Sequence, residues 1–170
     1  MSIYTYNQYL RNEALRLFKK KSFEQSSKYF ERYLYHNPND STMWISYSQM
    51  MKKPFRSESK ILRVQQGYIT NTTKNYVSRK SIIRSRKILY RGIQINDCNH
   101  NKAKIMLSLG LLEIQHGNQK YGIALIEKSV YLSRILLPVL KWQFIKQIIK
   151  NILHQSDLLN ARHCCKLLIV

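Results

Sequence analysis

Apolar residues recur at spacings of three and four along nearly the whole chain, the period that places them on one face of a helix. Turn residues are scarce, with five Gly and three Pro in 170 residues. An all-β protein of this length needs more of them, because short strands are joined by frequent tight turns. The pattern therefore predicts an all-α protein.

Four segments repeat one arrangement, in which two large residues are followed by polar residues and a further apolar residue. They begin 32, 27 and 37 positions apart, which suits a unit of two short helices and two turns. Such a unit has an apolar face that only a neighbouring unit can cover, so we expect an α-solenoid of about four antiparallel helix pairs and a terminal helix. The segments are 29–34, 61–66, 88–93 and 125–130.

The first of these segments is followed by an expected turn at 36–40. Asp40 or Ser41 is suited to cap the next helix, because its side-chain oxygen can accept from free backbone N–H groups. One face of that helix carries large side chains that we expect in the core, namely Trp44, Tyr47 and Met51.

Equivalent features follow the third segment. We expect a turn at 96–101 and then a helix that ends before Gly117, which suits the left-handed position after a helix. In the second unit, we expect residues 71–76 to form the corresponding turn, although they lack the proline that the first unit has there. The core positions that correspond to the first unit are Met106, Leu109 and Glu113.

These residues resemble a HAT repeat, the half-a-tetratricopeptide unit of RNA-processing proteins. The resemblance lies in Phe30-Glu31-Arg32, the turn with Pro38, and Trp44 with Tyr47. A longer stretch, residues 85–118, is similar to repeats of the HAT proteins that stabilise and process plastid messenger RNAs. The similarity covers 22–131 and implies a plastid location, with nuclear splicing or ribosomal-RNA processing as the alternative. We expect one domain over 1–170, with divergent helices at 138–170.

The charge balance points to an anionic partner. Lys and Arg total 29 against nine Asp and Glu, a formal net charge of +20. AT-rich coding favours Lys but also permits Asp and Glu, so it does not explain the missing acids. A charge excess of this size is typical of proteins that bind nucleic acid or an anionic membrane. The most apolar stretch, 135–140, is too short to span a bilayer, and no targeting peptide is evident at the N-terminus.

The basic residues are densest between 59 and 96, where nine Lys and Arg occur without an acid. On a helical wheel, four of them form a basic stripe about 16 Å long, namely Lys80, Arg84, Lys87 and Arg91. Opposite the stripe we expect a core face of Ile82, Ile83, Leu89, Tyr90 and Ile93. Arg79 and Arg86 lie near that face, so either both side chains extend past the core edge or one of them pairs with a carboxylate such as Glu113. We predict an RNA-binding surface, with Tyr76 as a stacking platform, made of Lys60, Arg63, Lys74, Tyr76, Lys80, Arg84, Lys87 and Arg91.

No set of residues suited to catalysis is evident. The five histidines lie mostly in expected turns, the acids are scattered, and there is no glycine-rich phosphate loop. His163-Cys164-Cys165 is better read as part of a terminal helix than as a metal site, because adjacent helical residues point about 100° apart. We expect no enzyme activity, no cofactor and no metal.

A different class of function remains open. A short array cannot track a long RNA by itself, so the chain is also compatible with a tetratricopeptide-like adaptor whose positive surface meets an acidic protein. The last residues, 164–170, are mostly apolar where a solenoid normally has a polar cap, so we expect them to dock on another chain or to fold back.

Overall fold

The computed structural model describes residues 3–53 and 71–155, and side chains within 3–53 and 79–152. The described residues form helices and contain no strand, so the expected all-α class is confirmed. In chain order the helices are α1 (Ile3–Lys19), α2 (Phe23–His36), α3 (Ser41–Met51), α5 (Asn71–Ile95), α6 (Asn99–Gln115), α7 (Gln119–Leu132), the 3-10 helix η1 (Arg134–Lys141) and α8 (Gln143–Gln155).

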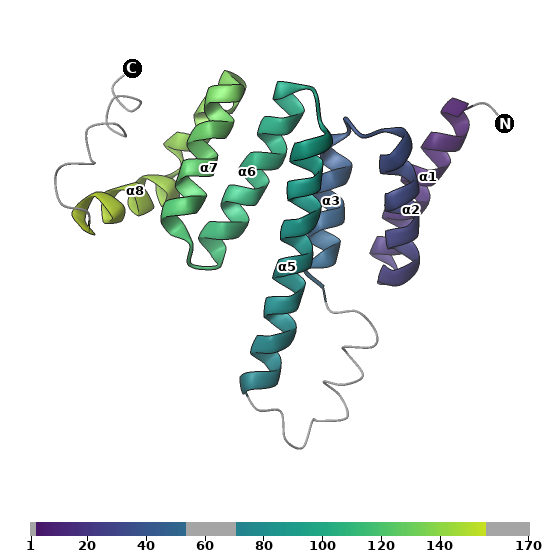
Figure 1. The fold of residues 1–170 in the computed structure, drawn as a ribbon, viewed down its shortest axis with the longest axis horizontal. Coiled ribbons are helices and arrows are strands. Elements are labelled where there is room, and N and C mark those ends of the chain that lie inside the picture. The colour runs from purple at the N-terminus through teal and green to yellow at the C-terminus, as the bar shows by residue number, and fades with distance from the viewer. Residues whose placement is uncertain (1–2, 54–70, 156–170) are drawn as a thin grey trace.

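The helices follow one another along the long axis of the molecule, from α1 at one end to α8 at the other (Figure 1). The closest packing joins α1 to α2, α3 to α5, and α6 to α7. Further contacts join α2 to α3, and α6 to both α3 and α5. The first turns of α5 project past the ends of its neighbours (Figure 1).

The first and third pairs share one geometry. α1 and α6 have 17 residues each, α2 and α7 have 14 each, and α6 and α7 begin 96 positions after α1 and α2. Both connecting turns place a left-handed residue after the first helix, Lys21 with φ 61° and Gly117 with φ 89°. The expected role of Gly117 is thereby confirmed.

Both turns also close with the same two backbone hydrogen bonds. In the α1–α2 turn, Lys21 donates to the carbonyl of Phe18 and Ser22 donates to that of Leu17. In the α6–α7 turn, the amides of Gly117 and Asn118 donate to the carbonyls of Ile114 and Glu113. This is the Schellman arrangement, which satisfies the last carbonyls of a helix.

Small residues allow the paired helices to approach closely. Ser26 on α2 donates from its hydroxyl to the carbonyl of Ala14 on α1 over 2.7 Å. The corresponding positions in α7 and α6 are Gly122 and Gly110, and a Cβ on Gly110 would lie 2.8 Å from the carbonyl oxygen of Gly122. Larger side chains at these positions would push the two helices apart.

The core is centred on Trp44, which is fully buried and packs against Gly92 of α5. Its indole N–H donates to the carbonyl of Pro38 over 2.7 Å. Tyr47, Met106, Leu109 and Glu113 are buried as expected, and Met51 packs partly buried against the same cluster. A second cluster joins α7 to η1 and α8.

The turn at 36–40 also forms as expected. Asp40 caps α3, because its carboxylate accepts from the backbone N–H groups of Thr42 and Met43. The turn expected at 96–101 is shorter than predicted: residues 96–98 lie beside the α2–α3 turn, whereas 99–101 begin α6. The side chain of Asn96 donates to the carbonyl of Pro38 over 2.9 Å, and that of Asn101 donates to the carbonyl of Asn39 over 2.7 Å.

Two expectations about the second unit are wrong. Residues 71–76 begin α5 and do not form a turn. The core face of α5 is also displaced from the expected one, since Ile83 and Tyr90 are 50% and 40% exposed while Ser81 and Ser85 are buried. The reason is close helix contact: Ser85 meets Ser48 of α3 with 3.1 Å between the two hydroxyls, and the larger side chains lie to the sides. The repeated segment at 61–66 lies outside the described residues.

Candidate nucleic-acid interface

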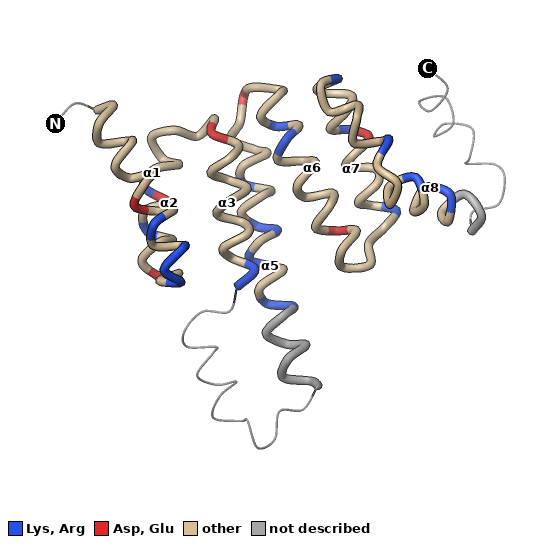
Figure 2. Tube along the Cα trace, turned by 180° about the vertical axis from the view of Figure 1, so that it is seen from behind, with Lys and Arg blue, Asp and Glu red and all other residues tan. Residues whose placement is uncertain are grey.

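The expected basic stripe lies on α5. Lys80 and Lys87 are exposed, and Arg84 is half-buried. The side chain of Arg91 retains 44% of its accessible surface. Lys and Arg positions are frequent along α5 and at the adjoining end of α3 (Figure 2). The four residues therefore share one side of the helix, but their surroundings differ.

Arg91 is held by two other helices. One of its guanidinium nitrogens lies 2.7 Å from Oε2 of Glu31 on α2, and the guanidinium lies 5.4 Å from the centre of the Trp44 ring. Glu31 also accepts from the Tyr47 hydroxyl over 2.8 Å. Burial, and then the charge of Glu31, raises the pKa of Tyr47. Arg91 thus contributes to packing as well as to the surface charge.

The other expected contact residues cannot be placed in the same way. Lys60 and Arg63 lie outside the described residues. Lys74 and Tyr76 belong to the first turns of α5, and their side chains are outside the described set. The structure therefore brings together Lys80, Arg84, Lys87 and Arg91 on one helix.

Arg86 makes the ion pair that was one of its two expected roles. Its guanidinium donates to both carboxylate oxygens of Glu113 on α6, over 2.5 and 2.6 Å. Glu113 is 2% exposed and also accepts from the side chain of Asn118 over 2.6 Å. Burial alone would raise the pKa of Glu113, but the hydrogen bonds from Arg86 and Asn118 outweigh burial and lower it. Arg86 therefore has a structural role.

Several described acids are engaged by neighbouring groups. Glu13 pairs with Arg16 within α1. Glu31 and Glu113 hold Arg91 and Arg86, and Asp40 accepts from backbone N–H groups and from the Tyr33 hydroxyl. These carboxylates hold the fold together and neutralise arginines that touch them. α5 itself contains no Asp or Glu, so its exposed lysines have no acidic neighbour on their own helix.

The lysines at the end of α3 were not predicted to belong to the basic surface. Lys52 is half-buried and its ammonium donates to the side-chain oxygen of Gln115 on α6 over 3.4 Å. Lys53 beside it is exposed. The signal was present, because Lys52-Lys53 directly follows the predicted helix, but only the antiparallel packing of α3 on α5 brings it to the basic stripe.

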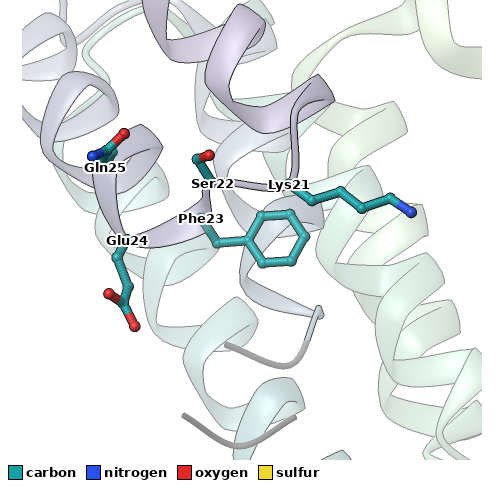
Figure 3. Close-up of a pocket in the computed structure, with 5 residues that line it drawn as sticks. All are labelled: Lys21, Ser22, Phe23, Glu24 and Gln25. Atoms are coloured by element: carbon teal, nitrogen blue, oxygen red, sulfur yellow. The ribbon is translucent and has the colours of Figure 1, made fainter. Parts of the chain in front are cut away.

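In the part of the chain that the structure describes, no group of three or more His, Cys, Asp and Glu side chains is arranged to hold a metal ion. None of the helices described is long and apolar enough to cross a membrane. A shallow pocket of about 210 Å³ lies at the α1–α2 turn, lined by Lys21, Ser22, Phe23, Glu24 and Gln25. Its polar side chains point in different directions and do not converge on one point (Figure 3).

Comparisons with protein-family models, with curated proteins and with solved structures found no match to this chain.

Proposed function

We propose that this chain is a non-catalytic helical-repeat protein, an α-solenoid of the HAT and tetratricopeptide type, that binds RNA through the basic surface of α5. The observation that supports the proposal most directly is the exposure of Lys80 and Lys87 on α5, a helix whose sequence contains no Asp or Glu. A face that serves solubility alone normally interleaves both signs, because like charges one turn apart repel each other.

The repeated geometry of the α1–α2 and α6–α7 pairs supports the solenoid part of the proposal. Two hairpins of the same lengths, with the same turn and the same small-residue contacts, are what stacked repeats of one unit require. The resemblance of the sequence to HAT proteins suggests that the bound RNA is a transcript held for maturation, in a plastid first and in the nucleus second.

Binding to a phosphate backbone predicts a specific dependence of RNA affinity on salt concentration. Each Lys or Arg that neutralises a phosphate releases counterions, so the affinity falls as salt rises, and each lost contact on single strands lowers the slope by about 0.7. We therefore expect the variant Lys80→Gln/Lys87→Gln to bind single-stranded RNA more weakly than the wild type, with a salt slope lower by up to about 1.4.

The matched control is Lys146→Gln/Lys150→Gln on α8. It removes the same charge from two exposed lysines on a different helix. RNA affinity is measured against salt by fluorescence anisotropy for all three proteins, after circular dichroism has shown equal helicity. Equal slopes for the two variants would mean that the charge acts diffusely, and the RNA interface on α5 would be rejected.

A second candidate function is a protein–protein adaptor, and exposed apolar side chains near the C-terminal end support it. Ile135 and Leu137 of η1 are 76% and 42% exposed, and Trp142 and Phe144 beside them are 43% and 47% exposed. The rings of Trp142 and Phe144 lie against each other, with 5.8 Å between their centres, and adjoining exposed apolar side chains are typical of interaction surfaces. If both lysine variants retain wild-type RNA binding, this surface becomes the better starting point.

A further inference from the structure

Positive groups from several parts of the fold meet at the C-terminal end of α3. Lys52 follows the last residue of α3, and its ammonium bonds Gln115 in the last turn of α6. His116 follows directly, at the end of α6. Lys53 is the exposed neighbour of Lys52, and the guanidinium of Arg86 reaches this end of α6 from α5, where it bonds Glu113 over 2.5 and 2.6 Å. Two helix ends and one helix side thus bring four basic side chains to one place.

The basic groups are close enough to disfavour one another's charge. Burial, and then the charge of Lys53, lowers the pKa of Lys52. Burial, and then the charges of Lys52 and Arg86, lowers the pKa of His116, while Glu113 acts in the opposite direction. Glu113 is engaged by Arg86, and within the described residues no carboxylate forms an ion pair with Lys52. A partly buried cation among other cations is unfavourable until an anion joins them.

The basic surface of α5 extends to this place. Ser48 meets Ser85 and Trp44 meets Gly92, so α3 and α5 run antiparallel. Lys52 lies one helical turn beyond Ser48, which places it level with Ser81 and beside the turn that carries Lys80 and Arg84. Figure 2 shows Lys and Arg positions on both helices here. Lys52 is therefore level with the N-terminal part of the basic stripe and extends the positive charge from α5 toward the end of α6.

We propose that Lys52 and His116 form a phosphate-binding position at the end of α3, occupied by one phosphate group of an RNA that lies along α5. The RNA as source of this phosphate rests on the proposed function, whereas inorganic phosphate offers the same chemistry without it. The ammonium of Lys52 and a protonated His116 each donate a charge-assisted hydrogen bond to phosphate oxygens.

Proton linkage gives the site a signature that a merely structural lysine lacks. A bound anion favours the charged imidazole, so phosphate binding raises the pKa of His116 and strengthens as pH falls. The charged groups that face His116 are Lys52 from α3, Arg86 from α5 and Glu113 from α6. Lys52 and Arg86 stay positive and Glu113 stays ionised while His116 titrates, so the change of charge belongs to His116.

The test is an NMR titration of the His116 ring protons in the full chain, alone, with inorganic phosphate and with a short oligouridylate. Both ligands are expected to raise the pKa of His116. Oligouridylate is expected to bind at least about fivefold more tightly at about pH 5.5 than at about pH 7.5, the lower end of usual coupling between sites. His116→Gln should remove most of that pH dependence, and Lys52→Met should abolish the rise in pKa, whereas Lys146→Met should change neither.

The outcomes separate the two proposals. Oligouridylate that binds with an unchanged pKa of His116 overturns the phosphate position and leaves RNA binding on α5 standing. A pKa that rises with inorganic phosphate while oligouridylate does not bind supports the position and overturns the proposed function. A pKa that neither ligand raises, or one that still rises in Lys52→Met, overturns the assignment of Lys52 and His116.

Discussion

Arg91 and Glu31 form an ion pair that joins α5 to α2, with 2.7 Å between nitrogen and oxygen across 60 positions of sequence. The same guanidinium lies over the Trp44 ring, and the same carboxylate accepts from Tyr47. One residue of the basic stripe therefore belongs to the network that holds α2 and α3 against α5, whereas Lys87, one turn earlier, does not.

Arg91→Gln is expected to destabilise the protein by about 1–2 kcal/mol, because a half-exposed ion pair and a cation–π contact each contribute up to about 1 kcal/mol. Lys87→Gln removes the same charge from an exposed position and should stay within about 0.5 kcal/mol of the wild type. Urea unfolding followed by circular dichroism measures both. Equal stabilities for the two variants would show that the contacts of Arg91 do not stabilise the fold.

Arg86→Gln should invert part of the pH dependence of stability. In the wild type, the pKa of Glu113 is lowered, so its stabilising contribution is present at neutral pH and is lost as pH falls through that lowered pKa. Without Arg86, the buried carboxylate has a raised pKa, and its cost appears as pH rises.

We expect Arg86→Gln to lose about 2–3 kcal/mol at neutral pH and to become more stable as pH falls toward about 5. Urea midpoints between neutral and mildly acidic pH test this, with Arg16→Gln in the exposed pair of α1 as the control. A variant whose midpoint falls with pH as the wild type's does would show that Glu113 does not depend on Arg86.

Lys21→Gly should stabilise the α1–α2 turn. Lys21 has φ 61°, a conformation that costs an L-residue about 1–2 kcal/mol and that glycine adopts freely. After the greater entropy of glycine in the unfolded chain is subtracted, a net gain of about 0.5–1 kcal/mol remains. Lys19→Gly, inside the last turn of α1, should instead destabilise by a similar amount, about 1 kcal/mol or less. Thermal unfolding of both variants distinguishes the two signs.

Residues with a local signature were predicted correctly from the sequence. Asp40 and Gly117 are examples, because a cap and a left-handed turn depend on a few adjacent residues. Trp44 and Tyr47 were placed in the core from helical spacing alone. The pair of Arg86 and Glu113 was anticipated as one of two alternatives, since both lie near apolar faces of neighbouring helices.

The residues whose positions were predicted wrongly are those that depend on how the helices pack. Apolarity alone placed Ile83 and Tyr90 in the core, but α5 approaches α3 through Ser85 and Gly92, since only small side chains fit between the two helices. Tyr90 instead points to the side, where its hydroxyl lies 2.8 Å from that of Tyr121 on α7. The end of α3 could not be linked to the stripe either, because the sequence does not reveal which helices run antiparallel and in contact.

The carbonyl of Pro38 accepts from two donors, the indole of Trp44 and the side chain of Asn96. The second donor lies 58 positions away in the chain, on the turn that leads into the third helix pair. Opening the α2–α3 turn would leave the buried indole N–H of Trp44 without an acceptor and the Asn96 amide with only the carbonyl of Gly92, so local fraying there is costly. Linear repeat arrays can unfold one unit at a time, but this bond couples the first turn to the end of α5. We therefore expect the amide protons around Pro38 and at the end of α5 to become exposed to exchange together.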